Sequence, residues 1–359
     1  MFGISCGRTH ASGPVDKATI IAAVRDYGTT KPSNQIGTAK PPKVGNDAAP
    51  LRPGDEGEYR TQVAAYLVEK NFDQLEKEVR QARESKSRFA GGVWVLFGFY
   101  DGVSEPVVGD QASDSDWKYH IGLLKNWIQA RPESAAARLA LAETYVKYAD
   151  VARGSGYANT VSETGWKLDS ERTDLAAREL VEASRLKEKC PFWYEVMQQV
   201  ALVQGWEKSE TRELFDNAIA FQPDYYHYYR EYANFLLPKW YGGPGEAERF
   251  AEEASSRVGG QEGSFIYFEI ATLVTCQCDS TDADMENLSW PKIKAGYAAL
   301  GQLYGYSNLK LNRYAHMAVE AGDKAAAQEA FSKIGDDWDH GVWHTGQKFE
   351  TAKLWAVSR

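Results

Sequence analysis

The stretch LKLNRYAHMAVEAGDKAAAQEAFSKI, residues 309–334, decides the fold of this 359-residue chain. Apolar residues recur at spacings of three and four on either side of Gly322-Asp323, and this pair is a turn signal. The stretch therefore predicts two short helices that fold back on each other. The small Ala315 on the first helix lets the second helix approach closely, and Phe331 on the second helix fills the space beside it.

The same helix-pair signature recurs from about residue 115 to the C-terminus. It follows the tetratricopeptide template, which has W-x2-L-G-x2-Y on one helix and A-x3-F with a late Pro on the next. The matching segments are Leu141-Ala142-x2-Tyr145, Tyr229-x2-Tyr232-Ala233-x2-Leu236, Leu311-x2-Tyr314-Ala315-x2-Ala318 and Ala327-x3-Phe331. Their small residues are not spaced by multiples of the usual repeat of about 34 residues. We therefore predict an all-α fold, an irregular tetratricopeptide-like array of helical hairpins, or α-solenoid.

Two further segments also predict helices. Ser134 to Arg153 is rich in Ala and Leu, and Ser134 is a good N-cap, so this segment predicts a long helix that ends at the following glycines. Phe89 to Tyr100 is a continuous apolar and aromatic run, which suits a buried strand or a buried helix. Its helical surroundings favour the helix.

The first 57 residues differ in composition from the rest. Val15 to Tyr27 predicts one short helix with Asp16 as its cap. Residues 29–57 are rich in Pro, Gly, Lys, Thr and Asp, and such a run cannot bury enough apolar surface to fold. The sequence thus predicts a flexible N-terminal arm and linker, residues 1–57, followed by a helical-repeat domain, residues 58–359.

Net charge and hydropathy indicate which classes of partner and which cellular compartment to expect for this chain. The net charge is −9 and no segment carries a basic block, so we expect no nucleic-acid binding. No stretch approaches the length of apolar sequence needed to span a bilayer, and Met1 to His10 lacks a signal peptide, so the chain as written is expected to be cytoplasmic. Phe2 to Cys6 nevertheless reads like the tail of an export signal. If the true start lies upstream, Cys6 could carry a lipid anchor outside the cytoplasm.

Several motifs resemble one bacterial family. They are Ala152-Arg153-Gly154-Ser155-Gly156 with Gly165-Trp166, Cys190-Pro191-Phe192-Trp193-Tyr194, Leu236-Leu237-Pro238-Lys239-Trp240, and Asn312-Arg313-Tyr314-Ala315 with Asp336-Asp337-Trp338. Together they resemble domain-of-unknown-function family 4034 (DUF4034) over roughly residues 60–350. The resemblance implies a tetratricopeptide-like helical fold. It implies no activity and supplies no catalytic residues.

A C-terminal group of polar residues is the best candidate for a metal site. His340 and His344 are four residues apart, so a helix would place both on one face near Asp339, and such side chains can hold Zn²⁺. The group lacks the His-Glu-x-x-His pattern, and nearby glycines weaken the helix. A polar last turn with its histidines packed on Trp338 and Trp343 is the favoured interpretation, and we expect no metal and no other cofactor.

The aromatic segment at residues 225–232 points to a binding surface. On a helix its rings surround the cylinder, and we expect some of them to line the groove of the array, since Tyr and Arg are enriched in binding hot spots. Packing between repeats is the alternative. The groove candidates are Tyr228, Tyr232, Trp240 and Arg153.

The function predicted from these features is that of a non-catalytic scaffold or adaptor that binds a protein or peptide in the groove. The prediction follows from the architecture, because no catalytic motif is present in the sequence. A metal-dependent enzyme that uses the C-terminal His/Asp group and a lipid-anchored envelope binding protein are the alternatives.

Overall fold

The computed structural model describes residues 15–28, 55–154, 160–277, 285 and 287–358. In these ranges the regular elements are all helical, with no strand, which confirms the predicted all-α class. Of the predicted linker at residues 29–57, residues 29–54 lie outside the described residues, as does Cys6, and residues 55–57 begin a helix.

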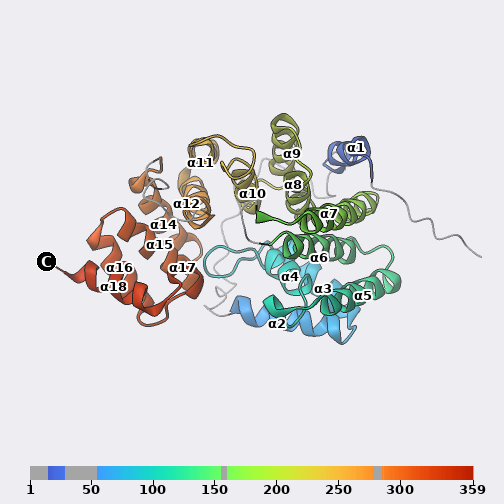
Figure 1. Ribbon diagram of the computed structural model, residues 1–359, viewed down its shortest axis with the longest axis horizontal. Coiled ribbons are helices and arrows are strands. Elements are labelled where there is room, and N and C mark those ends of the chain that lie inside the picture. Colours follow the sequence, from blue (N-terminus) through green and yellow to red (C-terminus); the bar gives the residue numbers. More distant parts are fainter. Residues whose placement is uncertain (1–14, 29–54, 155–159, 278–284, 286, 359) are drawn as a thin grey trace, which may run out of the picture.

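The first half of the chain contributes the helices α1 (Lys17–Tyr27), α2 (Asp55–Val68), α3 (Phe72–Ser85), α4 (Val95–Val103), the short 3-10 helix η1 (Gly109–Gln111), α5 (Asp114–Ala130), α6 (Ala135–Arg153) and α7 (Glu163–Ser184). Among them, α4, α5 and α7 pack on α6, α2 and α3 pack on α4, and α1 packs on α7 (Figure 1).

The second half continues the chain of packed helices to the opposite end of the molecule (Figure 1). They are α8 (Phe192–Val203), α9 (Lys208–Phe221), α10 (His227–Phe235), α11 (Glu246–Val258), α12 (Gly260–Gln277), α14 (Trp290–Leu303), α15 (Asn308–Glu320), α16 (Lys324–Ile334), α17 (His340–Trp343) and α18 (Gly346–Val357). No helix in the described part of the chain combines the length and the apolar character that crossing a bilayer requires.

The helix pair predicted at residues 309–334 forms as α15 and α16. Asp323 caps α16 by accepting a hydrogen bond from the backbone N–H of Ala326 at 3.0 Å. Ala315 and Ala327 are fully buried where α15 and α16 pack together, and Phe331 is buried beside them. The small residues thus permit the close approach of the two helices, and the aromatic ring fills the remaining space.

The long helix α6 also forms as predicted and lies at the centre of the first half. The Ser134 hydroxyl accepts a hydrogen bond from the N–H of Ala137 at 3.0 Å, and Gly154, with φ +77°, ends the helix. Buried alanines along α6 allow close packing against α7, and α4, α5 and α8 cover its other sides. The side of α6 that faces Asp101 on α4 carries charged residues.

The apolar run at residues 89–100 is helical only in its second part. Helix α4 begins at Val95, and residues 89–94 form a turn that is closed by a bridge between Arg88 and Trp94. Gly91 has φ +86°, and a Cβ there would lie 2.4 Å from the Ser307 hydroxyl. The prediction of a continuous helix from Phe89 is therefore wrong, because this positive-φ turn cannot be helical.

Helix α1 is part of the packed fold, although it lies within the range predicted as an arm. It packs on α7 and α9, and Tyr27 stacks on Trp193 with ring centroids 4.1 Å apart. The Tyr27 hydroxyl donates to the carbonyl of Cys190 at 3.2 Å and accepts from its N–H at 2.8 Å. The division of the chain at residue 57 stays a prediction.

Candidate functional site

One side of α6 carries charged residues from the interior to the surface. Glu143, Lys147 and Asp150 are spaced by four and three residues, so they lie on the same side of the helix. Glu143 is 5% exposed, Lys147 is largely buried, and Asp150 is open to solvent. We call these three residues the charged face of α6.

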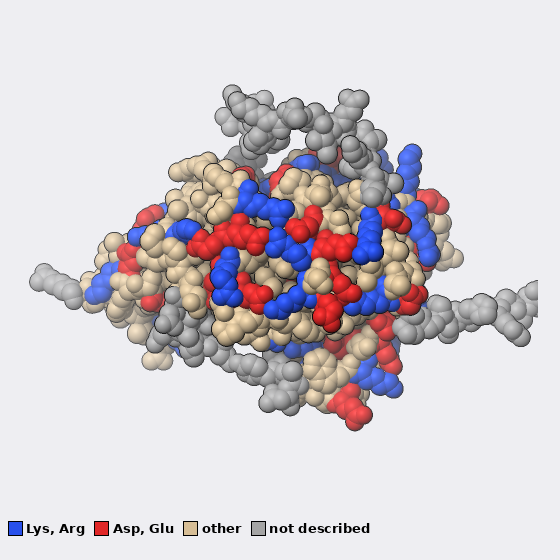
Figure 2. Space-filling view, turned by 90° about the horizontal axis from the view of Figure 1, so that it is seen from above, with Lys and Arg blue, Asp and Glu red and all other residues tan. Residues whose placement is uncertain are grey.

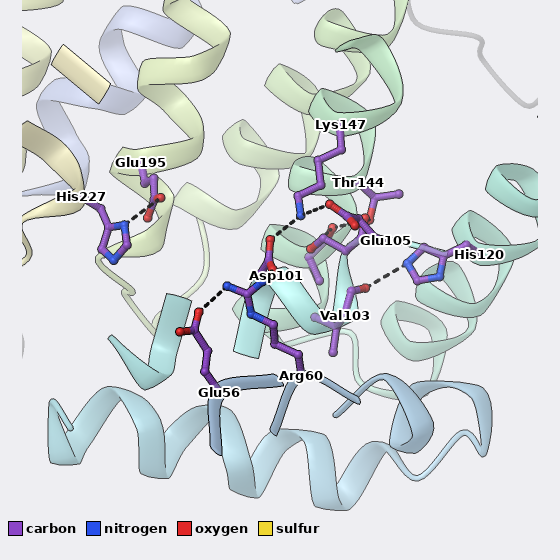
Figure 3. A network of polar contacts seen from close by, with 12 residues as sticks. Glu56, Arg60, Asp101, Val103, Glu105, His120, Thr144, Lys147, Glu195 and His227 are labelled. Atoms are coloured by element: carbon purple, nitrogen blue, oxygen red, sulfur yellow. Dashed lines mark hydrogen bonds and ion pairs between the residues drawn. The ribbon is translucent and has the colours of Figure 1, made fainter. Parts of the chain in front are cut away.

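Lys147 joins this face to α2 and α4 through a chain of alternating charges (Figure 3). Its Nζ lies 2.6 Å from Asp101 Oδ1 and 2.6 Å from Glu105 Oε1. Asp101 Oδ2 also pairs with Arg60 at 2.5 Å, and Arg60 pairs with Glu56 one helical turn away. Burial lowers the pKa of Lys147, but the surrounding carboxylates outweigh it and raise the pKa overall.

Deeper in the molecule, carboxyl groups are buried with incomplete pairing. Burial raises the pKa of Glu143 to about 8, and its Oε2 has no hydrogen-bond partner among the described residues. Glu195 on α8 accepts a hydrogen bond from the Tyr225 hydroxyl at 2.6 Å, and burial raises its pKa well above the usual value. His227 Nδ1 lies 3.7 Å from Glu195 Oε1, and burial lowers the pKa of His227 (Figure 3). Glu231 has its pKa raised to about 7 by the same desolvation.

Toward the surface, the charged face of α6 ends in a hollow. Its lining residues are Glu105, Gly109, Asp110, Ala112, Trp117, Lys147, Asp150 and Val151. Val151 is 56% exposed, and Val107 and Val108 in the adjoining loop are 71% and 55% exposed. Although Asp150 is open to solvent, the surrounding protein and the Asp169 carboxylate raise its pKa to about 6. The hollow thus combines an excess of carboxylates with exposed apolar side chains.

At the last turn of α6, Arg153 meets two tryptophans from other parts of the chain. Its guanidinium lies 4.7 Å from the ring centroid of Trp240, in the loop after α10, and 5.7 Å from that of Trp166, on α7. Arg153 donates to the carbonyl of Gly154 at 3.3 Å and forms no ion pair with a carboxylate of the described residues. We call Arg153, Trp166 and Trp240 the arginine–tryptophan cluster.

The structure therefore brings together only two of the four predicted groove residues, Arg153 and Trp240. Tyr228 is fully buried, and its hydroxyl donates to the carbonyl of Pro191 at 2.8 Å. Tyr232 is 6% exposed and stacks on Phe215 at 4.8 Å. Because the short helix α10 packs against α8, α9, α11 and α12, its rings meet a neighbour on every side. Tyr228 and Tyr232 are core residues and lie outside the site.

The C-terminal histidines do not share a helical face. Helix α17 ends at Trp343, and His344 has φ +60°, so the four-residue spacing from His340 does not act through a helix. Asp339 instead caps α17 by accepting from the N–H of Val342 at 2.9 Å. His340 lies beside the ring of Trp338 at 5.9 Å. Within the described ranges, no three His, Cys, Asp or Glu side chains are arranged to hold a metal ion.

The buried charges are the part of the site that the sequence analysis missed. One available signal is Glu143, an acidic residue inside the Ala/Leu-rich run of α6. A carboxyl at such a position faces either solvent or the interior, and the spacing alone does not say which. Glu195 and His227 gave no comparable local signal, because they come together only through the packing of α8 and α10.

The fold and the site define an all-helical protein with a charged hollow at the end of its central helix. Residues 62–204 match the model of a family described as domain of unknown function (DUF4034), the family that the sequence motifs resemble. The matched range contains the charged face of α6, Arg153 and Trp166, while Trp240 lies beyond it. A comparison with curated proteins finds no match.

Proposed function

We propose that this protein is a non-catalytic scaffold or adaptor, and that it binds a segment of a partner protein in the hollow at the end of α6. The observation that carries the proposal is the composition of the hollow. The exposed Val151 and unbalanced carboxylates line the same opening, and the exposed Val107 and Val108 come directly before its lining residue Gly109 in the chain. Exposed apolar and charged side chains together are typical of interaction sites. We propose that an irregular tetratricopeptide-like array of helix pairs presents this hollow.

The charges of the hollow favour a basic partner segment. Glu105, Asp110 and Asp150 supply three carboxylates, whereas Lys147 is the single basic residue of the lining and already pairs with Glu105 and Asp101. A Lys or Arg side chain of the partner would complement this excess. By contrast, acidic and basic side chains are interleaved on the face shown in Figure 2.

Apolar contacts would supply a second part of the affinity. Val107, Val108 and Val151 each expose more than half of their surface. Covering one such side chain contributes about 1.5 kcal/mol when burial is complete. A partner segment with apolar residues beside its basic residue would use both features of the hollow.

The position of the titrating carboxyl groups supports a non-catalytic role. Glu143 and Glu195 have the raised pKa values that general acids often show, but they are 5% and 1% exposed. A reacting group in the hollow would have to reach them through packed side chains. We therefore assign their raised pKa values to burial and not to chemistry on a substrate.

Site-specific photocrosslinking in native cells tests the proposal. A benzophenone amino acid replaces Val151, and the matched control carries it at Leu354, which is 66% exposed on α18. Mass spectrometry identifies the crosslinked partner peptide. That peptide is then synthesised, and its affinity is measured for the wild type, for the Asp110→Asn/Asp150→Asn variant and for the control Glu84→Gln, a change on the exposed side of α3.

We expect a basic partner peptide that crosslinks from position 151 and not from position 354. Its affinity should fall about tenfold in the double variant, as for the loss of roughly 1.4 kcal/mol, and stay unchanged in Glu84→Gln. Equal crosslinking from both positions would contradict the proposal. So would a peptide whose binding is indifferent to the two carboxylates.

A further inference from the structure

Arg153 is held in place by aromatic rings and yet has no carboxylate partner among the described residues. Three other partly buried arginines are paired with carboxylates: Arg60 with Asp101, Arg138 with Glu179, and Arg172 with Asp114. Arg88 resembles Arg153 in lying over aromatic rings, but it donates to the Asp224 carbonyl. Arg153 lies over the rings of Trp240 and Trp166, and its protein hydrogen bond goes to the Gly154 carbonyl. Its charge is therefore oriented but not neutralised by direct contact.

The surroundings of the guanidinium suit an incoming anion. Trp166 is 38% exposed, so the arginine–tryptophan cluster reaches the surface. The indole N–H of Trp240 and the Nε–H of Arg153 are buried donors without a hydrogen-bond partner among the described residues. Stacking on indoles restricts the rotation of a guanidinium, and a fixed guanidinium presents its N–H groups in the fork that a carboxylate fits.

We propose that the arginine–tryptophan cluster is a carboxylate-binding subsite, in which Arg153 receives a carboxylate of the partner segment. The inference rests on the proposed function for the nature of the ligand. Asp150 of the hollow and Arg153 are three residues apart, which corresponds to about 4.5 Å of helix rise. One segment can therefore place a basic side chain in the hollow and a carboxylate on Arg153.

Two acidic residues near Arg153 reduce the affinity expected for a carboxylate at this subsite. Asp150 and Asp169 both lie in the field of Arg153, although neither reaches ion-pair distance of its guanidinium. Asp169 is 2% exposed, and burial raises its pKa although Arg153 and Arg172 act to lower it. Their negative charge weakens the attraction of Arg153 for an anion, so an isolated small carboxylate should bind with a Kd on the order of millimolar.

Nuclear magnetic resonance of the tryptophan indole N–H groups tests the subsite on the full chain. The signals of Trp166 and Trp240 are assigned with single Trp→Phe variants. The probes are N-acetylglycine, which mimics a peptide C-terminus, N-acetylglutamate α-amide, which carries a side-chain carboxylate, and the uncharged N-acetylglycinamide. Sodium chloride at matched ionic strength is the fourth titrant. The variants are Arg153→Gln, Arg153→Lys and the control Arg185→Gln, an exposed arginine of the α7 C-cap paired with Glu182.

We expect saturable shifts of the Trp240 and Trp166 indole signals with at least one carboxylate probe, and the stronger probe identifies the source of the carboxylate. Affinity should fall at least tenfold in Arg153→Gln and less in Arg153→Lys, and Arg185→Gln should match the wild type. Equal shifts with N-acetylglycinamide or with sodium chloride would overturn the inference, as would the absence of saturable shifts in the wild type. Circular dichroism checks that each variant is folded.

The two proposals fail separately. If the hollow binds no partner peptide but the carboxylate probes bind at Arg153, the proposed function fails and the subsite stands as a site for small anions. If the peptide binds with the same affinity to Arg153→Gln and to the wild type, and the probes do not bind, the subsite fails and the hollow stands.

Discussion

Replacing Glu143 with Gln should remove a large pH dependence from the stability of the protein. Glu143 is buried on α6, its Oε2 has no hydrogen-bond partner among the described residues, and burial raises its pKa from 4.5 to about 8. The folded state therefore binds this proton more tightly than the unfolded state. Stability from this group is full below the unfolded pKa and is lost as the pH rises through the folded pKa.

The magnitude follows from the difference between the two pKa values. One pKa unit corresponds to about 1.4 kcal/mol, so a single group with these values costs the wild type about 4 kcal/mol of unfolding free energy between pH 5 and pH 9. The amide introduced by Glu143→Gln would be neutral at every pH. It would therefore add no pH dependence to the free energy of unfolding. Neighbouring carboxyls such as Glu231 and Glu195 titrate in both proteins, so the difference between the two pH profiles reports Glu143 together with its electrostatic effect on Glu195.

Urea denaturation followed by tryptophan fluorescence at several pH values measures both profiles. We expect the free energy of unfolding of Glu143→Gln to increase steadily relative to that of the wild type as the pH rises. The control Glu84→Gln changes an exposed carboxyl of α3 and should run parallel to the wild type. If the Glu143→Gln and wild-type profiles stay parallel within about 1 kcal/mol, an amount below one pKa unit, the assignment of a buried protonated Glu143 is refuted.

Three further predictions concern stability and protonation. Tyr27→Ala removes a buried ring and its hydrogen bonds to Cys190, so it should cost about 3–5 kcal/mol and speed amide hydrogen exchange throughout α1. Lys310→Ala breaks a buried pair in which Nζ lies 2.5 Å from Glu269 Oε2, and urea denaturation should show a loss of about 3–5 kcal/mol. His120 donates from Nε2 to the Val103 carbonyl at 3.0 Å, and burial lowers its pKa to about 4. Its ring should therefore stay neutral in NMR titrations down to pH 5. The contribution of His120 to the free energy of unfolding is lost as the pH falls from 6.5 to 4. A titration midpoint of His120 near pH 6.5 would contradict its burial.

Helix positions were predictable wherever the signal was local. Ser134 and Asp323 cap the helices for which they were expected, because an N-cap acts within one turn of its own helix. The run at residues 89–100 was harder, because periodicity does not separate a buried helix from a buried turn. Gly91 gave a hint, but its close approach to Ser307 depends on a helix more than two hundred residues away in the chain.

The candidate site was predicted in part. Arg153 and Trp240 were both marked by motifs, yet nothing in their local sequence placed them in contact. Tyr228 and Tyr232 carried the same kind of aromatic signal and are buried. Which rings on a helix face solvent depends on how many neighbours cover it, and neighbours are a property of the tertiary structure.

The sequence by itself determined the helices that carry local signals, such as α6 and the α15–α16 pair, because caps and apolar faces depend on interactions within a few residues. It also determined which charged and aromatic residue types were available. Only the tertiary structure decided that Glu143 is buried and holds its proton near neutral pH, and that Arg153 lies over two tryptophans with no carboxylate of the described residues paired to it. Desolvation and long-range contacts produce both properties, and both exist only once distant helices have packed together.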